Sequence, residues 1–334
     1  MNTEDLEIYI KKCIEAYYKG EPLISDEVYD RLVENTQFEN EVGNQQVNPD
    51  EQRFNHPFPM YSLQKVFVGE DKEPNWDKTQ PYIMTAKLDG AAVSVTYVNG
   101  ELYQALTRGD GKQGLDITEK IRYLVPEVLS GTLQGALSDG SPKLIQVTGE
   151  VVCPKTIANA RNFASGSLGL KDNNEFGNRV REHGFQFVAY GLQPNQEDRW
   201  NQDMALLDMS GFKTVIQSDW SMFPNDGSVI RLDSNTYFES LGYTSHHPRG
   251  AYALKIRQKG VVTKLLDVEW QVGKSGAVSP VAILEPCIIG EATVSRATLH
   301  NKGYIEALGL EIGCMVEVIR SGEIIPRIVG RIDE

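Results

Sequence analysis

Apolar and polar residues alternate with a period of two in a long stretch that begins near residue 81. The segment AAVSVTYVNGELYQALTRGDG keeps this alternation on both sides of Asn99-Gly100. An Asn-Gly pair between two alternating runs is the strongest short-range signal of a β-hairpin. Further strands are indicated by LIQVTGEVVC and FQFVAYGL. We therefore predict antiparallel sheets in this part of the chain, with a hairpin that turns at Asn99-Gly100.

The first 50 residues have helical periodicity instead. Apolar residues recur at helical spacing between Thr3, which suits an N-cap, and Gly20, which suits a helix end. A second helical pattern starts near Ser25, and the stretch VGNQQVNPDEQRFNHPFPMYS after it is rich in Asn, Gln and Pro. That composition is typical of a linker.

Short strands with turn signals recur after residue 262, in LLDVEWQVG, SPVAILEP and MVEVIRSGEIIPRIVG. Such a run fits a compact antiparallel barrel of OB-fold size. We predict an α+β multidomain chain with a helical subdomain and linker over residues 1–55, antiparallel sheets with helices over 56–262, and an OB-fold barrel over 263–334.

The composition speaks against a membrane span, a secretory signal and a zinc ribbon. The chain has no apolar run of about 18 residues, so no membrane span is expected. Its acidic start lacks the pattern of a secretory signal, and we expect a soluble, cytoplasmic protein. The four cysteines include no C-x-x-C pair, which excludes a zinc ribbon and leaves no protein-built metal site to predict.

The net charge of −13 speaks against nucleic-acid binding, because phosphate-binding proteins usually carry a basic surface. The charge is uneven, however. Residues 1–60 hold 13 Asp and Glu against 5 Lys and Arg. Any DNA-binding surface must therefore lie beyond this segment.

Lys87 in KLDG has two interpretations. It could be a solvated lysine at a strand edge, beside a turn formed by Asp89 and Gly90. It could also be a nucleophile, since a lysine amine held neutral by nearby cations or by burial can form a covalent intermediate.

Further motifs favour the nucleophile. TRGDG brings Arg108 back beside Lys87, VTGEVV carries Glu150, and ARNFASGSLG combines Arg161 with small residues. NDGSVIR and AYALKIRQ add Arg231 and Lys255. Several cations and a carboxylate around one lysine suit transfer of a nucleotidyl group to an amine.

These segments, in this order, resemble the nucleotidyltransferase superfamily, and specifically the NAD-dependent DNA ligases. The resemblance rests on long matches: PMYSLQKVF, KLDGAAVSVTYVNG, TRGDGKQGLDIT, ARNFASGSL, LGYTSHHPRGAYALKI, DVEWQVGKSGAVSPVAILEP, VSRATLHN and LGLEIGCMVEVIRSGEIIPRIV. The N-terminal YYKGEPLISDEVYDRL is similar to the helical domain of the NAD-dependent branch. Residues 56–262 would then be the nucleotidyltransferase, or adenylation, domain.

The resemblance implies sealing of nicks in duplex DNA through a lysyl-AMP intermediate, with NAD+ as the adenylate donor and Mg2+ as the metal cofactor. It implies catalytic roles for Lys87, Asp89, Arg108, Glu150, Arg231 and Lys255. The nucleotide would also be held by Ser62, Leu63, Gly90 and Tyr190, and the nicotinamide mononucleotide part by Tyr17, Tyr18, Asp26, Tyr29 and Asp30. DNA would be bound by Arg161, Lys171, Lys274 and Arg320.

Some positions depart from the family pattern. Thr85 stands where an acidic residue near adenine is expected, and Arg231 replaces a lysine. Gly169 replaces a DNA-contacting arginine, which Lys171 could compensate, and Lys274 replaces an arginine of the barrel.

The sequence ends at Glu334, after the predicted barrel, whereas the bacterial enzymes continue into zinc, helix-hairpin-helix and BRCT modules. The resemblance is therefore to a compact, phage- or virus-like form. Three alternatives stay open: a self-adenylating subunit that needs a second subunit for sealing, a degenerate fold that binds nicks or nucleotides, and an ATP-dependent ligase, which the N-terminal match disfavours.

Overall fold

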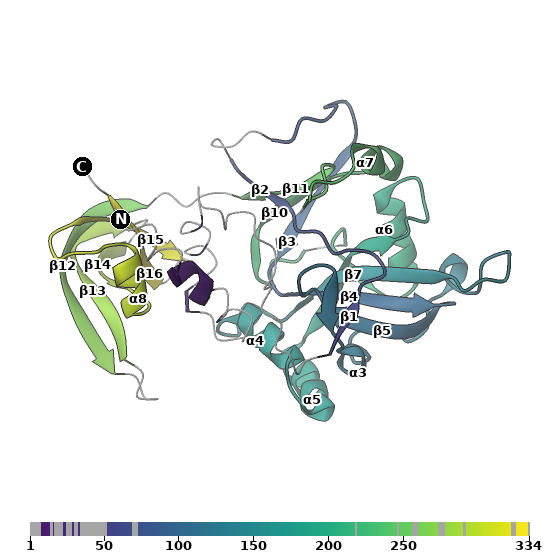
Figure 1. Cartoon of the computed structure of the whole chain (residues 1–334), viewed down its shortest axis with the longest axis horizontal. Coiled ribbons are helices and arrows are strands. Elements are labelled where there is room, and N and C mark those ends of the chain that lie inside the picture. Colours follow the sequence, from purple (N-terminus) through teal and green to yellow (C-terminus); the bar gives the residue numbers. More distant parts are fainter. Residues whose placement is uncertain are drawn as a thin grey trace. The chain divides into compact units, whose positions relative to one another are not determined.

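The computed structural model describes residues 8–13, 16, 23–24, 29, 33, 52–68, 73–217, 219–245, 247–255, 260–272, 278–289, 292–321 and 325–332. The chain forms two compact units, one of residues 42–256 and one of residues 1–41 with 257–334. Each unit combines strands with helices (Figure 1), which confirms the α+β class. Within the described ranges, no helix is both long and apolar enough to cross a membrane.

A five-stranded sheet with the order β5-β4-β7-β8-β9 forms the centre of the first unit. Its strands are β4 (Ala91–Val98), β5 (Glu101–Thr107), β7 (Leu144–Val152), β8 (Gln186–Gln193) and β9 (Lys213–Thr214). Val93, Val95 and Tyr97 of β4 are fully buried, and so are the intervening Ser94 and Thr96. Because successive side chains of a strand point to opposite faces, the sheet is covered on both faces along β4.

A four-stranded sheet lies in the same unit and has the order β2-β11-β10-β3. Its strands are β2 (Gln64–Phe67), β3 (Tyr82–Leu88), β10 (Asn225–Leu232) and β11 (Ala251–Lys255). Only Asp89 and Gly90 separate β3 from β4, so these two residues carry the chain from one sheet to the other. A small core containing Val66, Trp76 and Tyr252 packs on this sheet.

The hairpin predicted at Asn99-Gly100 is confirmed. Strands β4 and β5 pair in antiparallel fashion, and Asn99 and Gly100 have φ angles of 54° and 89°. These left-handed values are those that an Asn-Gly turn supplies. The predicted linker, however, is not wholly irregular, because β1 (Arg53–Asn55) pairs with β6 (Gln113–Leu115). A strand of three residues is too short for its sequence pattern to reveal.

Helices cover the sheets of the first unit, and α4 packs against α5 (Figure 1). The helical segments are α3 (Thr118–Ile121), η1 (Gly131–Leu133), α4 (Ala160–Leu168), α5 (Asn173–His183), α6 (Trp200–Met209) and α7 (Asn235–Leu241).

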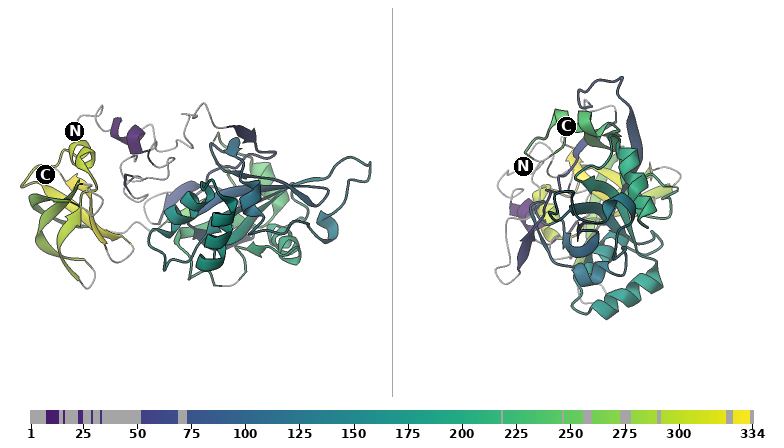
Figure 2. Two further views of the ribbon diagram at one scale, coloured as in Figure 1. Left: turned by 90° about the horizontal axis from the view of Figure 1, so that it is seen from below. Right: turned by 90° about the vertical axis from the view of Figure 1, so that its right-hand side faces the viewer.

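The second unit contains a closed barrel with the order β12-β13-β14-β16-β15, seen as the green and yellow strands of Figures 1 and 2. Its elements are β12 (Val261–Val272), β13 (Val278–Ile289), β14 (Ala292–Thr298), α8 (Lys302–Ala307), β15 (Met315–Ser321) and β16 (Ile325–Ile332). The predicted barrel is confirmed. Helical residues 8–13 share its core, where Tyr9 Oη donates to Asn301 Oδ1 at 3.3 Å.

Candidate active site

Lys87, Lys255 and Asp226 come together from three adjacent strands. Lys87 Nζ lies 2.9 Å from Asp226 Oδ1, and Lys255 Nζ lies 3.0 Å from Asp226 Oδ2. Strand β10 pairs with both β3 and β11, which explains why residues far apart in sequence meet here. One carboxylate therefore holds two ammonium groups side by side.

Asp226 stays ionised because of these two lysines. Burial alone would raise the pKa of its carboxyl, but the charges of Lys87 and Lys255 outweigh burial and lower the pKa below its usual value. The side chain of Lys87 is 28% exposed and that of Lys255 only 12%. Lys87 is thus the more accessible amine of the pair.

Asp89 and Gly90, which connect the two sheets, contact further charged residues beside Lys87. Asp89 Oδ1 lies 3.1 Å from Arg161 Nε, and Gly90 N donates to Glu150 Oε1 at 3.2 Å. A Cβ at Gly90 would lie 2.2 Å from the carbonyl oxygen of Val151, so only glycine fits at this point. The backbone therefore comes close enough to bond Glu150.

Two carboxyl groups of the cluster have strongly raised pKa values. Burial, the charge of Asp226 and the charge of Glu150 raise the pKa of Asp89 to about 7, although Lys87 and Lys255 oppose the shift. Burial likewise raises the pKa of Glu150 to about 7 against the opposing charges of Lys87 and Arg108. Perturbed carboxyl groups around an accessible lysine are typical of a catalytic site.

Tyr190 also belongs to this neighbourhood. Burial raises the pKa of its hydroxyl, Glu150 raises it further, and Arg108 opposes both. Glu150 and Tyr190 lie on the paired strands β7 and β8. The structure thus brings Lys87, Asp89, Gly90, Arg108, Glu150, Tyr190, Arg161 and Lys255 of the predicted set into one connected region.

Arg108 follows β5 at the start of a tight turn. Gly109 and Gly111 have φ angles of 56° and 87°, and a Cβ at Gly109 would lie 1.9 Å from the carbonyl oxygen of Gln113. These positions favour glycine because other residues rarely adopt such angles. The turn fixes the backbone on which Arg108 stands.

His56 holds the same turn and was not found from the sequence. Its Nε2 lies 3.0 Å from the carbonyl oxygen of Arg108, and its Nδ1 lies 2.8 Å from Ser94 Oγ. Burial lowers the pKa of His56, so the neutral ring must donate from Nε2 to the carbonyl and accept at Nδ1. The residue stands in the predicted linker, where no local pattern marks it.

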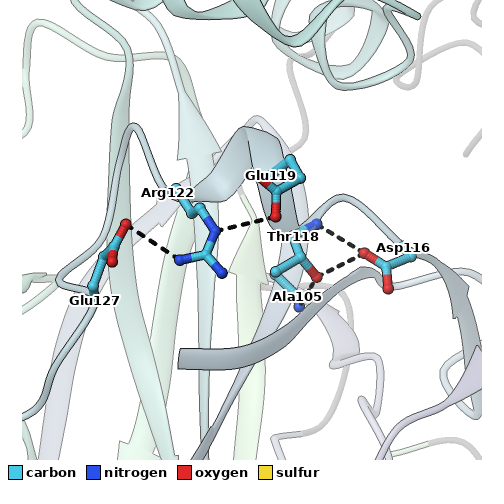
Figure 3. A network of polar contacts seen from close by, with 6 residues as sticks. All are labelled: Ala105, Asp116, Thr118, Glu119, Arg122 and Glu127. Atoms are coloured by element: carbon cyan, nitrogen blue, oxygen red, sulfur yellow. Dashed lines mark hydrogen bonds and ion pairs between the residues drawn. The ribbon is translucent and has the colours of Figure 1, made fainter. Parts of the chain in front are cut away.

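The strand before Arg108 is anchored by the network in Figure 3. Asp116 Oδ1 accepts hydrogen bonds from the backbone N and the Oγ1 of Thr118, and Thr118 Oγ1 accepts from Ala105 N at 2.9 Å. Arg122 bridges Glu119 and Glu127 at 3.2 Å to each. These contacts secure α3 to β5.

Arg231 lies elsewhere. Its guanidinium donates to the carbonyl oxygen of Leu232 at 2.7 Å and to Asn235 Oδ1 at 3.0 Å. It also stacks on the rings of Trp200 and Phe238, at 5.0 and 4.3 Å from their centroids. Its strand partner in β3 is Ile83, about 13 Å along the strand from Lys87 at 3.3 Å per residue. Its predicted catalytic role remains a prediction.

The remaining predicted residues are dispersed or undescribed. The carbonyl oxygen of Ser62 lies 3.2 Å from His247 Nδ1, Leu63 packs on the small core of the four-stranded sheet, and Lys171 is exposed. Tyr29 packs against the core of the second unit. Outside the described residues lie Tyr17, Tyr18, Asp26, Asp30, Lys274 and the side chain of Arg320.

An open pocket of about 470 Å³ runs along β3 from Ile83 to Ala86, and its other lining residues are Val215, Ile216, Asp219, Trp220, Ser221 and Asn225. Thr85, two residues before Lys87, is among its lining residues. Its volume lies within the range of small-molecule pockets.

Comparison with known proteins identifies the family of this chain. A family model described as the NAD-dependent DNA ligase adenylation domain matches residues 49–157, and one described as the NAD-dependent DNA ligase OB-fold domain matches residues 262–334. Two proteins named DNA ligase, from Acinetobacter baumannii strains AYE and SDF, are each 33% identical to this chain over an alignment of 386 positions. The alignments cover 96% of this chain and 55% of each relative, so the chain spans about half their length.

A solved structure titled Pmar-Lig_Pre. is similar with a TM-score of 0.35 and 13% identity, over 75% of this chain and 63% of that chain. This similarity is too distant to support an argument. The two family models match an adenylation domain and an OB-fold domain of the same family within this one chain. The chain belongs to the NAD-dependent DNA ligase family.

Proposed function

We propose that this chain is a NAD-dependent DNA ligase that seals nicks in duplex DNA, with Lys87 as the nucleophile. The observation that carries the proposal is the pairing of Lys87 with Asp226, beside Lys255 and the two carboxyl groups of Asp89 and Glu150. The substrates, NAD+ and nicked DNA, are proposed from family membership. The chemical roles are proposed from the cluster of charged side chains around Lys87.

In the first step the Lys87 amine attacks the adenylyl phosphorus of NAD+. Lys87 reacts as the neutral amine, so the ammonium ion paired with Asp226 first gives up a proton. A phosphoramidate P–N bond then forms with loss of a second proton from nitrogen, the P–O bond to nicotinamide mononucleotide breaks, and that nucleotide leaves. Lys255 and Arg161 supply positive charge for the transferring phosphate, which is the largest contribution that a protein makes to such reactions. Asp226 orients the Lys87 amine through its 2.9 Å contact.

In the second step the AMP passes from Lys87 to the 5′-phosphate of the nick, and in the third the 3′-hydroxyl displaces AMP. Arg161, Lys171, Lys274 and Arg320 are the proposed DNA contacts. Each of these cations releases counterions when it contacts a phosphate, so we expect sealing to fall as salt rises, with a slope set by the number of such contacts.

The nicotinamide mononucleotide part of NAD+ is proposed to bind to Tyr17, Tyr18, Asp26, Tyr29 and Asp30. Aromatic faces and carboxylates suit the oxidised nicotinamide ring because that ring is cationic. The adenosine part is proposed to bind to Ser62, Leu63, Gly90, Glu150 and Tyr190. The domain bounds 1–55, 56–262 and 263–334, and a cytoplasmic role in DNA replication and repair, belong to the same proposal.

Mg2+ is proposed to enter with the nucleotide phosphates. No group of three or more His, Cys, Asp or Glu side chains suited to a metal occurs among the described residues. Mg2+ commonly uses one or two carboxylates together with substrate phosphates and water. Asp89 and Glu150 are the carboxyl groups that would hold the ion, and the ion would neutralise charge on the phosphates.

The test is sealing of a nicked duplex by the purified chain with Mg2+ and either NAD+ or ATP. With Mg2+ present, we expect NAD+ to give a lysyl-AMP adduct and sealed product, and ATP to give neither. An adduct without sealed product would instead support the self-adenylating subunit that needs a partner. The proposal fails if neither nucleotide yields an adduct.

A further inference from the structure

Tyr190 occupies an irregular position in its strand. Thr148 of β7 pairs with Gly191 of β8, but the next residue, Gly149, pairs with Ala189. Tyr190 therefore has no partner opposite it and forms a β-bulge. A bulge bends the strand and redirects the side chain of the extra residue, and bulges are common next to active sites.

The residues around the bulge leave little room for other conformations. A Cβ at Gly191 would lie 2.2 Å from Thr148 Oγ1, and a Cβ at Gly149 would lie 2.4 Å from the ring of Phe187. Glycine on each strand therefore permits the close approach that the bulge requires.

Trp200 bonds the bulge directly. Its indole Nε1 donates to the carbonyl oxygen of Tyr190 at 3.1 Å. Trp200 begins α6 and is 3% exposed, and its own backbone N donates to the carbonyl oxygen of Asp233 at 2.7 Å. The carbonyl of a bulged residue is displaced from the regular ladder, so a side-chain donor here replaces a strand partner.

Arg231 fixes the ring of Trp200. The guanidinium lies between the rings of Trp200 and Phe238, and its hydrogen bonds to the carbonyl oxygen of Leu232 and to Asn235 hold it in plane. Arg231 stands on β10 of the four-stranded sheet, and Tyr190 on β8 of the five-stranded sheet. A continuous path of contacts therefore joins the two sheets at Tyr190.

We propose that Trp200 is a positioning residue for nucleotide binding. Its indole N–H holds the Tyr190 bulge in the shape that presents the tyrosine ring to the nucleotide, and Arg231 holds Trp200 in place. The inference rests on the proposed function, since Tyr190 has a nucleotide to contact only if the chain binds one.

The variant Trp200→Phe tests this, because it keeps an aromatic ring against Arg231 and removes the N–H donor together with part of the ring volume, a loss that the control variant Trp76→Phe shares. We measure the single-turnover rate of adduct formation against NAD+ concentration. The NAD+ concentration at half-maximal rate should rise about threefold to tenfold, as expected for one lost hydrogen bond, while the maximal rate changes less than about twofold.

Trp76→Phe is the matched control. Trp76 is also buried, lies against Tyr252 in the core of the four-stranded sheet, and has a cation, Lys78 Nζ, 5.9 Å from its ring centroid. The same loss of an indole N–H there should leave the NAD+ dependence unchanged. Thermal unfolding of both variants records any loss of stability.

A double-mutant cycle separates positioning from general stability. If Trp200 acts through Tyr190, Trp200→Phe should have no further effect on NAD+ dependence in a Tyr190→Ala background. An equal effect in both backgrounds, or unchanged NAD+ dependence in Trp200→Phe alone, overturns the inference. Should Trp200→Phe not fold, Arg231→Lys replaces it in the same cycle, because an ammonium cannot reproduce the planar stacking.

The two proposals fail in different ways. If the wild-type chain forms no adduct, the proposed function is overturned and this inference with it. If the wild-type chain is active and Trp200→Phe matches it, only the inference is overturned.

Discussion

The two ends of strand β10 hold cations in opposite ways. At one end, Asp226 faces both Lys87 and Lys255, so two amines share one carboxylate. At the other end, Arg231 is enclosed by two rings and bonded to Leu232 and Asn235. The first set leaves an accessible amine beside perturbed carboxyl groups. The second satisfies its cation with local partners.

The difference shows that a buried cation is reactive or structural according to its partners, and not according to its charge. Burial lowers the pKa of Arg231 to about 10 against the opposing charge of Asp203, yet Arg231 remains protonated at neutral pH. It therefore contributes planar stacking and directed hydrogen bonds. At the other end, Lys87 and Lys255 share one carboxylate, and Lys87 keeps a side chain that is 28% exposed.

The largest expected effect is at Lys87. Lys87→Ala should abolish adduct formation with NAD+, by more than about 10³-fold, because no other group can supply the P–N bond. Intact-protein mass spectrometry after incubation with NAD+ and Mg2+ measures this. Lys87→Arg is the matched variant, since it keeps the charge beside Asp226 and lacks a nucleophilic amine. Adduct formation in either variant would contradict the role of Lys87 as the nucleophile, and with it the contrast between the two ends of β10.

Asp226→Asn should have the next largest effect. The amide keeps the shape of the side chain but leaves Lys87 and Lys255 without the charge that orients them. We expect adduct formation to slow by about 100-fold to 1000-fold, the range for loss of one positioned electrostatic contact. Single-turnover rates measure it.

Glu239→Gln makes the same chemical change at the Arg231 end, where Glu239 accepts a hydrogen bond from Tyr243 Oη. It should leave the rate of adduct formation within about twofold of wild type, as expected for an exposed group away from the reacting atoms. If Asp226→Asn and Glu239→Gln slow adduct formation equally, the Lys87 end of β10 does not differ from the Arg231 end in its effect on the reaction.

Glu150→Gln should change how stability depends on pH. The pKa of Glu150 is about 7 in the folded protein, because of burial, against an ordinary value of 4.5. The folded state keeps this proton while the unfolded chain releases it, so its contribution is complete below pH 4.5 and is lost as pH rises through 7. Relative to wild type, the Gln variant should gain about 1–3 kcal/mol in unfolding free energy between pH 5 and pH 8.

Denaturant unfolding at several pH values measures this gain. A constant difference between the two proteins across that range would contradict the raised pKa of Glu150. The neighbouring Asp89, whose pKa is also raised to about 7 by burial and by Asp226, gives a second variant, Asp89→Asn, with the same expected sign.

Arg231→Lys should give the smallest of these effects. An ammonium keeps the charge but loses the stacking and the fixed pair of hydrogen bonds, so we expect about 1–2 kcal/mol lower unfolding free energy. Lys78→Ala is the control, because Lys78 pairs with Glu73 at the surface and such pairs contribute less than about 1 kcal/mol. If Arg231→Lys costs no more than Lys78→Ala, Arg231 is not the structural element described above.

The sequence predicted the elements whose signals are local. The Asn99-Gly100 hairpin and the barrel repeat their pattern over many residues, and Lys87, Glu150 and Lys255 stand in extended motifs. Each of these features can be predicted because its pattern lies in residues that are close together in the sequence.

What the sequence did not predict depends on contacts between distant strands. The sequence marks Asp226 only as part of the strand motif NDGSVIR, and its two lysine partners become evident from the pairing of β10 with β3 and β11. The register of β10 also shifts between Asn225 and Ser228, and no local sequence pattern predicts that irregularity. His56 and Trp200 act through single hydrogen bonds to distant carbonyl groups, and no periodic pattern marks such contacts.

The most direct test of the central claim is to locate the adenylate. After incubation with NAD+ and Mg2+, the chain is digested and its peptides are analysed by mass spectrometry. We predict that one peptide gains the mass of AMP and that fragmentation places it on Lys87. AMP found on Lys255 or on another residue, or on none, would contradict the assignment of Lys87 as the nucleophile.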